Sequence, residues 1–262
     1  MQTKMPFMRH ILLFIFILFL SVTACKRGGD KSSISIGINY QIDGQELVTH
    51  APCYRNEAGN EFLVTEIQWF ASNFAIEDLD GIWHPLNETG HVFYLDENSL
   101  HPFLCQPIKA GHYSALRFTF GLDETDNITG RFTNPPESEM WWPEPLGGGY
   151  HYMKLNGKWR NPDGLLVPFN VHLGIGQNEG LTQFYHNQFV VELPFNGPLA
   201  VTADEKLSIS ISMNIGNWFR SPHTYDFNEW GGAIMQNQAA QQVLRENGLD
   251  VFQLSVTKEP KP

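Results

Sequence analysis

Residues whose spacing commonly marks a metal or catalytic site are scarce in this chain. Its 262 residues include three cysteines, and no two of them form a CxxC pair. The histidines form neither an HxH nor an HExxH pattern. A GxSxG elbow, a GxxxxGK(S/T) phosphate loop and a GxGxxG turn after a strand are also missing. We therefore expect a protein that is not an enzyme and in which any metal ligands come from distant parts of the chain.

Basic residues are few as well. Lysine and arginine number 17 against 28 aspartates and glutamates, which gives a formal net charge of −11 at pH 7. Removal of an N-terminal segment that contains Lys4 and Arg9 but no acid would leave 15 basic residues and a charge of −13. Because such a chain is repelled by phosphate backbones, we expect no nucleic acid among its partners.

The one long apolar run lies at the N-terminus. Lys4 and Arg9 precede the apolar residues 11–20, the order of a secretory signal. Ten apolar residues are too few to span a bilayer as a helix, which takes about 20. Small residues at 22–24 then stand directly before Cys25, which resembles the lipobox of bacterial lipoproteins. We therefore expect residues 1–24 to be a cleaved lipoprotein signal peptide and Cys25 to be acylated.

This assignment sets the compartment and the domain boundaries. Residues 25–32 would form a lipid-anchored polar tether, and residues 33–262 a single domain of a length common for one sandwich. The protein would be anchored, through palmitate and the other acyl chains, to a membrane of the cell envelope, on its periplasmic or outer-membrane face. In an oxidising compartment Cys53 and Cys105 are expected to form a disulfide, with thiolate ligation of a metal as the alternative.

Alternating hydrophobic residues predict strands along most of the chain. In residues 207–215, Leu, Ile and Met alternate with Ser and Asn, as in a strand with one buried face. Other stretches that alternate, or that are rich in aromatic and β-branched residues, are 34–40, 64–76, 112–122, 167–175, 188–193 and 252–256. Because turn residues separate them, we predict an all-β fold, a single antiparallel β-sandwich, Ig-like or jelly-roll-like, with long loops.

One short C-terminal helix is expected between Ala233 and Asn247. Met235, Ala239 and Val243 would share one face of it, and Gly248 would end it. Because this segment directly precedes the last predicted strand, we expect the helix to pack over one end of a sheet.

Two long irregular segments interrupt the predicted strands. The first begins with Met140, Trp141 and Trp142 and continues through two prolines and three glycines, which no regular element accommodates. A strand follows, with His151 and Met153 on one face. The second segment, residues 217–227, is aromatic and contains His223. Binding groups concentrate on loops that a rigid scaffold holds, so these segments are the candidate binding regions.

Five blocks of the sequence occur in a recognisable order. They are residues 68–73 (QWFASN), residues 109–113 (KAGHY) with 120–123 (FGLD), residues 140–157, residues 172–174 (HLG) and residues 235–252. Together they resemble the copper-binding MbnP-like family that is associated with methanobactin systems. The form PEPLGGGYH is similar to the branch of that family found in Bacteroidetes lipoproteins.

This resemblance implies a periplasmic β-sandwich that binds copper. In some members the copper is held by histidines and by a tryptophan that a partner, a di-haem cytochrome c peroxidase-like protein, oxidises to kynurenine. Carried to this chain, the resemblance implies copper as the cofactor and Trp142 as the candidate for oxidation, although the adjacent Trp141 leaves the choice between the two open. Storage, scavenging and delivery of copper are all compatible with it.

Imidazole chemistry gives three histidines as candidate ligands, since neutral histidine is a common ligand for copper. His151 directly follows the glycine-rich loop. His172 is predicted on the polar face of a strand together with Asn170, where simple solvation is the alternative. His223 lies in the aromatic loop, where a hydrogen-bonding role is the alternative. The predicted metal site is therefore His151, His172 and Trp142, with His223 as a further candidate.

A function of a different class remains open from the sequence. The aromatic loops contain four tryptophans, Trp141, Trp142, Trp218 and Trp230. If these formed an exposed platform, the protein would be a non-enzymatic extracytoplasmic binding or adhesion module for a peptide, a sugar or a partner protein.

The lipoprotein assignment gives a direct prediction. Cys25→Ser removes the only sulfur to which the acyl group can be attached at this site, so the variant should move from the membrane fraction to the soluble fraction. Immunoblotting of fractionated cells measures this, with Cys53→Ser as the matched control that should stay with the membrane. A Cys25→Ser protein that remains in the membrane fraction would show that the lipid anchor has been assigned wrongly.

Overall fold

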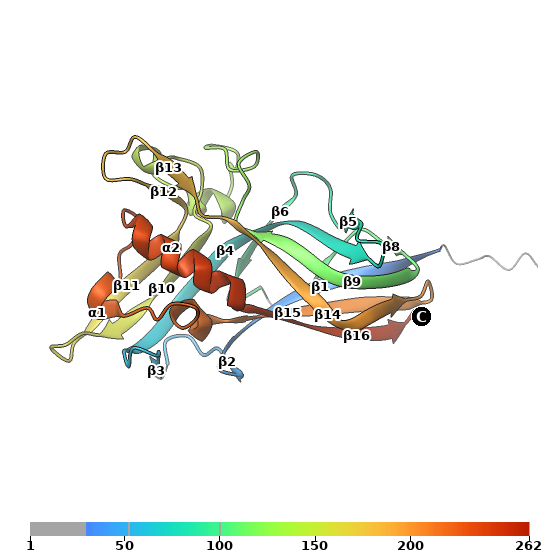
Figure 1. Cartoon of the computed structure of the whole chain (residues 1–262), viewed down its shortest axis with the longest axis horizontal. Helices are drawn as coiled ribbons and strands as arrows, with labels where there is room; N and C mark the ends of the chain where they lie inside the picture. The colour runs from blue at the N-terminus through green and yellow to red at the C-terminus, as the bar shows by residue number, and fades with distance from the viewer. Residues whose placement is uncertain (1–29, 52, 100, 262) are drawn as a thin grey trace, which may run out of the picture.

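The computed structural model describes residues 30–261 except residues 52 and 100 (Figure 1). The expected signal peptide, residues 1–24, and the expected lipid site at Cys25 lie outside these residues. The first strand begins at Lys31, within the expected tether. Over the residues that the structure describes, no helix combines the length and the apolar character needed to cross a membrane.

The first of two main sheets is built around β1 (Lys31–Ile42). The strand order is β16 (Phe252–Pro260), β15 (Glu205–Asn214), β1 and β2 (Gln45–Glu46), and the short strands β7 (Phe103–Leu104) and β8 (Ile108–Lys109) also pair with β1. Strands β1 and β15 pair in parallel, whereas the other pairs of this sheet are antiparallel. The alternation predicted for these strands is confirmed, since every second residue of β1 and β15 is buried.

The second sheet is built around the long strand β4 (Glu61–Asp78). Its order is β11 (Leu166–Leu173), β10 (Met153–Arg160), β4, β9 (Gly111–Phe120) and β14 (Phe189–Val201), and three short strands, β3 (Tyr54–Arg55), β5 (Trp83–Pro85) and β6 (Val92–Asp96), also pair with β4. The first half of β4 pairs with β10 and the second half with β9. Strand β4 therefore joins the two halves of the molecule.

Aromatic side chains from the second sheet fill the space between the sheets. Trp69 stacks on Phe120 with ring centroids 5.4 Å apart and lies 5.6 Å from the Phe252 ring of the opposite sheet. Its indole N–H donates to the Tyr40 hydroxyl at 2.9 Å, so β4 and β1 are joined by a polar contact inside an apolar core. The predicted all-β sandwich is confirmed, with the parallel β1–β15 pair as the departure from a purely antiparallel arrangement.

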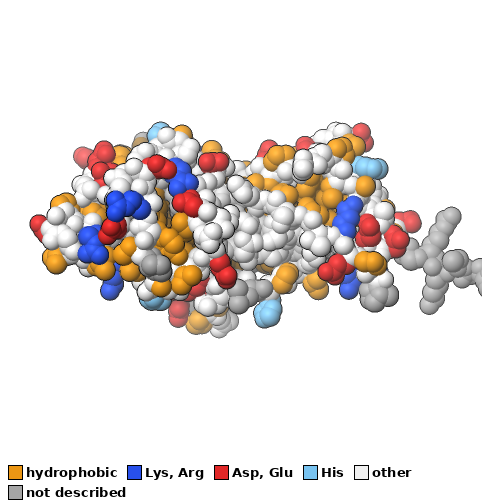
Figure 2. Space-filling view, turned by 90° about the horizontal axis from the view of Figure 1, so that it is seen from below, with side chains coloured by type: hydrophobic (Ala, Val, Ile, Leu, Met, Phe, Trp, Pro, Cys, Tyr) orange, Lys and Arg blue, Asp and Glu red, His pale blue; other side chains and the backbone are white. Residues whose placement is uncertain are grey.

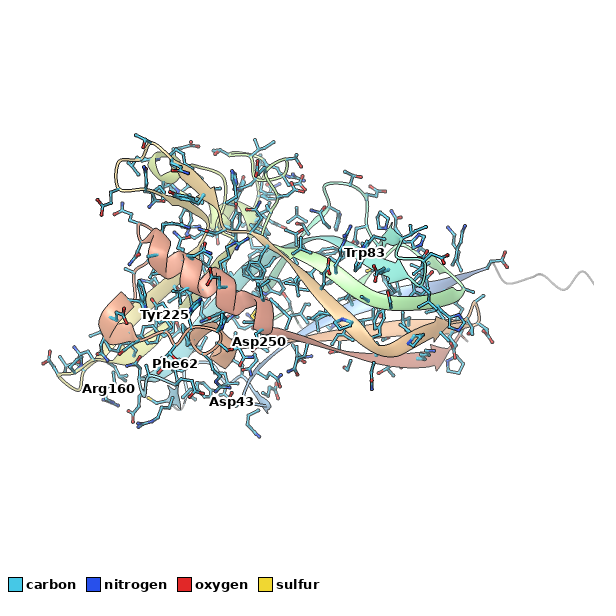
Figure 3. The ribbon with its side chains drawn as sticks, viewed as in Figure 1. Asp43, Phe62, Trp83, Arg160, Tyr225 and Asp250 are labelled. Atoms are coloured by element: carbon cyan, nitrogen blue, oxygen red, sulfur yellow. The ribbon has the colours of Figure 1, made fainter. Side chains whose placement is uncertain are left out.

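A second aromatic cluster fills the end of the molecule where β10 and β11 lie. Phe62 and Tyr225, labelled in Figure 3, belong to it, together with Phe169, Phe219 and Phe227, whose ring centroids lie 5.1–6.4 Å from their neighbours. The 3₁₀ helix η3 (Ile215–Phe219) contributes Phe219 and the short helix α1 (Phe227–Trp230) contributes Phe227, whereas Phe62 and Phe169 come from β4 and β11. This cluster gives β10 and β11 a packed support.

The C-terminal helix differs in phase from the sequence prediction. Helix α2 (Gln238–Asn247) begins after Asn237, whose side chain accepts a hydrogen bond from the Ala240 N–H at 3.1 Å, and the 3₁₀ turn η4 (Gly248–Asp250) continues it. Its buried residues are Ala240, Gln241, Leu244 and Asn247, so the expected face of Met235, Ala239 and Val243 is wrong. Met235 lies before the helix, Ala239 is exposed and Val243 is partly buried, because the neighbouring side of α2, with Ala240 and Leu244, is the side that packs against the core.

The glycine-rich segment forms a closed loop between the 3₁₀ helix η1 (Glu137–Met140) and β10. A second 3₁₀ helix, η2 (Glu144–Leu146), lies inside it. The backbone N–H of Trp142 donates to the Gly149 carbonyl at 2.9 Å, and this bond closes the base of the loop. Gly149 has φ 80°, and a Cβ at this position would collide with the Asn127 amide, so the loop requires glycine there. Beside it lies a separate two-stranded ribbon, β12 (Ile175–Gln177) and β13 (Phe184–His186).

The expected disulfide is wrong. Cys53 and Cys105 are both free, the first exposed and the second partly buried. Cys53 directly precedes β3, which pairs with the beginning of β4, whereas the Cys105 N–H donates to the Ile34 carbonyl near the beginning of β1 at 2.9 Å. In Figure 1, β3 and the first residues of β1 lie at opposite ends of the molecule, so the two sulfurs cannot meet without refolding.

Candidate metal centre

His151 is buried at the closed end of the glycine-rich loop, two residues before β10 begins, with 5% of its surface exposed. Its backbone N–H and its ring Nδ1 both lie within hydrogen-bond distance of the Met140 carbonyl oxygen, at 2.6 and 3.0 Å. A carbonyl oxygen only accepts, so Nδ1 carries the proton and Nε2 carries the lone pair. Nε2 is buried and has no hydrogen-bond partner among the described residues.

His172 is oriented by an amide in the neighbouring strand. Its Nε2 lies 2.9 Å from Oδ1 of Asn156, and the Asn156 Nδ2 donates to a carboxylate oxygen of Glu66 at 2.8 Å. Because the amide nitrogen donates to the carboxylate, the amide oxygen must accept from His172, which places the ring proton on Nε2. The Nδ1 of His172 therefore has the lone pair. As predicted, His172 points away from the buried face of β11, and it is partly buried there.

The two imidazoles and Trp142 form one contact group. The His151 and His172 ring centroids are 4.9 Å apart at an interplanar angle of 83°, and the Trp142 and His151 rings are 4.7 Å apart at 74°. Trp142 is fully buried, and its indole N–H donates to the Leu146 carbonyl at 3.1 Å. A Cβ at Gly174 would lie 2.5 Å from the Trp142 ring, so this glycine makes room for the tryptophan. The neighbouring Trp141 is 48% exposed.

Both imidazoles are held in the neutral form that binds metal ions. Burial, and then the neighbouring His172, lower the pKa of His151 to about 3. Burial, and then the Lys154 cation, lower the pKa of His172 to about 4. Neutral histidines with one ring nitrogen fixed by an oxygen acceptor and the other free are the usual form of histidine metal ligands.

A pocket of about 410 Å³ opens beside His172. It is bounded by η2, β11 and the segment before α2, and its lining is Pro143, Leu146, Asn170, His172, Ala233, Met235 and Gln236. Met235 is partly buried and brings a thioether to the same pocket as His172. Met140 and Met153, by contrast, are fully buried in the core. Over residues 30–261, apart from the two undescribed positions, no three His, Cys, Asp or Glu side chains gather as a metal-binding group. Any third ligand beside the imidazoles would have to be of another type.

His223 lies elsewhere. It is exposed, its ring contacts the Glu246 carboxylate, and its backbone N–H donates to the Asn247 side chain at 2.9 Å, all at the C-terminal end of α2. No contact joins it to His151 or His172 within the described chain. Of the predicted site residues, the structure brings together His151, His172 and Trp142 and leaves His223 apart.

The tryptophan platform of the alternative function is not present as predicted. Trp142 and Trp218 are fully buried, Trp230 is partly buried, and Trp141 is exposed. Figure 2 shows one face of the molecule on which hydrophobic, acidic and basic side chains are interspersed. Stacking on a ligand would therefore depend on Trp141 rather than on four tryptophans.

Asn156, Lys154, Glu66 and Met235 were missed by reasoning from the sequence. Lys154 and Asn156 are two residues apart and therefore lie on the same face of β10. Lys154 is the register partner of His172. The alternation is visible in the sequence, whereas the pairing of β10 with β11 and β4 becomes known only from the fold.

The fold and these contacts define a β-sandwich protein with a pair of neutral imidazoles beside a pocket. The family model of MbnP matches residues 31–237, and the chain belongs to the MbnP family, as the five sequence blocks predicted. Among solved structures, MbnP from Methylosinus trichosporium is similar at 15% identity with a TM-score of 0.45, over 69% of this chain and 76% of that chain. No curated protein matches the chain.

The buried imidazoles predict a pH dependence of stability. Their pKa values of about 3 and 4 lie below the value of about 6.5 in an unfolded chain, so below pH 6.5 the unfolded state binds protons that the folded state excludes. The free energy of unfolding of the metal-free protein should therefore fall as the pH decreases from about 6 to about 4, by up to about 1.4 kcal/mol per pH unit for each histidine.

Urea unfolding at several pH values measures this effect. The double variant His151→Gln, His172→Gln should show a shallower decrease than the parent protein, because the remaining titrating groups are common to both. His84→Gln is the control, because His84 is partly exposed and bound to Asp78. In this variant the free energy of unfolding should decrease with falling pH about as steeply as in the parent protein. Equal slopes in the parent and the double variant would contradict the assignment of two buried neutral histidines.

Proposed function

We propose that this protein binds copper through His151 and His172, outside the cytoplasm and anchored to a membrane by a lipid at Cys25. The observation that carries the proposal is the Nε2 atom of His151, a buried lone pair without a partner in the described residues, next to a second oriented imidazole. A buried polar atom without a partner costs free energy that a bound ion would offset. Membership of the MbnP family supports a copper-related role.

The donor types favour copper over harder ions. Imidazole and thioether ligands suit copper, whereas magnesium and calcium select oxygen ligands, and no group of three His, Cys, Asp or Glu side chains is found among the described residues. Two imidazoles from His151 and His172 with the Met235 sulfur would give a site of low coordination number. A site with one open side at the pocket is compatible with storage, scavenging or delivery of the ion.

Trp142 enters the proposal as a residue open to oxidation. An unmodified indole has an N–H donor and no lone pair for a metal, and here the N–H is occupied by Leu146. Conversion to kynurenine would open the indole ring beside His151 and supply amino and keto groups that can coordinate. A di-haem cytochrome c peroxidase-like partner is the proposed source of that oxidation. Peptide mass spectrometry of protein from the native host should locate the mass change at Trp142 and not at Trp141.

The ligand assignment predicts the behaviour of histidine variants. His151→Ala and His172→Ala should each lose stoichiometric copper, because each removes one of two imidazoles. His84→Ala is the matched control, since His84 lies on β5 in the other half of the sandwich and its side chain is partly exposed. Metal analysis of the purified proteins measures the copper content, and circular dichroism checks that each variant is folded.

Retention of one copper per chain by the folded double variant would refute the proposed site. Because His151 is buried and its loss leaves a cavity, His172→Ala alone provides the test if the His151 variant does not fold. His172 is partly buried at the pocket, so its replacement disturbs packing less.

The Asn156 amide predicts a smaller effect. Asn156→Ala removes the acceptor that orients His172 while leaving both imidazoles in place, so copper affinity should fall about 10- to 100-fold rather than disappear. Competition with a chelator of known affinity measures the change, and the exposed Asn196→Ala serves as the control. An unchanged affinity in Asn156→Ala would mean that the amide does not position the ligand.

A further inference from the structure

Lys154 places a cationic group beside the two imidazoles. It lies on β10, where its register partners are His172 on β11 and Gln68 on β4. Its side chain is partly buried, and Nζ donates to the Glu139 carbonyl at 2.6 Å. Glu139 is adjacent to Met140, whose carbonyl oxygen holds His151. The end of η1 therefore fixes both the ammonium group and one imidazole.

The charge of Lys154 is not cancelled by a direct ion pair. None of the ion pairs in the described part of the chain includes Lys154. The acidic groups that act on it are Glu66 and Glu139. The Glu66 carboxylate already accepts hydrogen bonds from Asn156 and Gln68, at 2.8 Å each. Lys154 is thus held by a neutral carbonyl group rather than by a carboxylate, at the end of η1 that also orients His151.

A fixed cation at this position opposes the addition of further positive charge. Lys154 and His172 are register partners on neighbouring strands, and the Lys154 ammonium group is bonded to the carbonyl of the residue before Met140, which orients His151. Repulsion grows with the charge of the bound ion, so a divalent ion is penalised more than a monovalent one. In a partly buried setting one additional unit of charge corresponds to about one to two orders of magnitude in a binding constant.

We propose that Lys154 is a specificity-determining residue that weakens binding of divalent ions at the His151–His172 site relative to Cu(I). The inference rests on the proposed copper function and adds to it the charge of the ion that the site accepts. Lys154 acts on the ion through space and is not a ligand, since its ammonium group has no lone pair to donate.

Lys154→Met tests the proposal with a side chain of similar length and no charge. The affinities for Cu(I), Cu(II) and Zn(II) are measured by competition with chelators, and the reduction potential of the bound copper by redox titration. In Lys154→Met the Cu(II) and Zn(II) affinities should rise about 10- to 100-fold relative to that for Cu(I), and the potential should fall. Lys154→Arg should keep the parent values.

Lys158→Met is the matched control. Lys158 lies on the same face of the same strand, four residues further along and exposed, so it shares the strand and the charge but not the position beside the imidazoles. Its replacement should change neither the affinity ratios nor the potential.

Three outcomes would contradict the proposal, and each shows a different part of it to be wrong. Unchanged affinity ratios in Lys154→Met that still binds copper would overturn the role of Lys154 and leave the proposed function standing. An equal loss of affinity for all three ions would mean that Lys154 only supports the loop, which also overturns the charge argument. Absence of copper binding by the parent protein with His151 and His172 intact would overturn the proposed function itself.

Discussion

The Met140 carbonyl oxygen accepts two hydrogen bonds from one residue, from the backbone N–H and from the ring of His151. The first bond closes the loop that contains both tryptophans, and the second decides which ring nitrogen has the proton. One oxygen atom thus takes part both in closing the loop and in orienting the imidazole. Trp142 lies within this loop with its ring 4.7 Å from that of His151, and the His151 ring lies 4.9 Å from that of His172.

The support for this arrangement comes from the sheet. Met153 pairs with Trp69 on one side and with Leu173 on the other, and all three are fully buried, so the site is built directly next to the core. Glu66, Asn156 and His172 come from three adjacent strands and form a row of hydrogen bonds across them. A strand shifted by one residue would turn these side chains to the opposite face. The register of β4, β10 and β11 therefore has a direct chemical consequence at the site.

Much of the fold could be predicted from the sequence, because hydrophobic alternation in β1, β15 and β16 reports directly which face is buried. The His151–His172 pairing was predicted from position next to irregular loops and from family resemblance. The disulfide was predicted wrongly because the parity of cysteines says nothing of their distance. The helix face was predicted wrongly because Met235 precedes the helix and the core contacts the neighbouring side of α2, which carries Ala240 and Leu244. Contacts that cross strands, such as Asn156 with His172, depend on register and could not be predicted.

Strand β1 also sets the distance along the sandwich between Lys31 and the two imidazoles. Tyr40 is bonded to Trp69, and Trp69 pairs with Met153, so the imidazoles lie at the level of Tyr40 along the sandwich. From Lys31 to Tyr40 the strand rises about 30 Å, at about 3.3 Å per residue. If Cys25 carries the proposed lipid, the length of β1 would separate the imidazoles from the end of the sandwich nearest to that lipid.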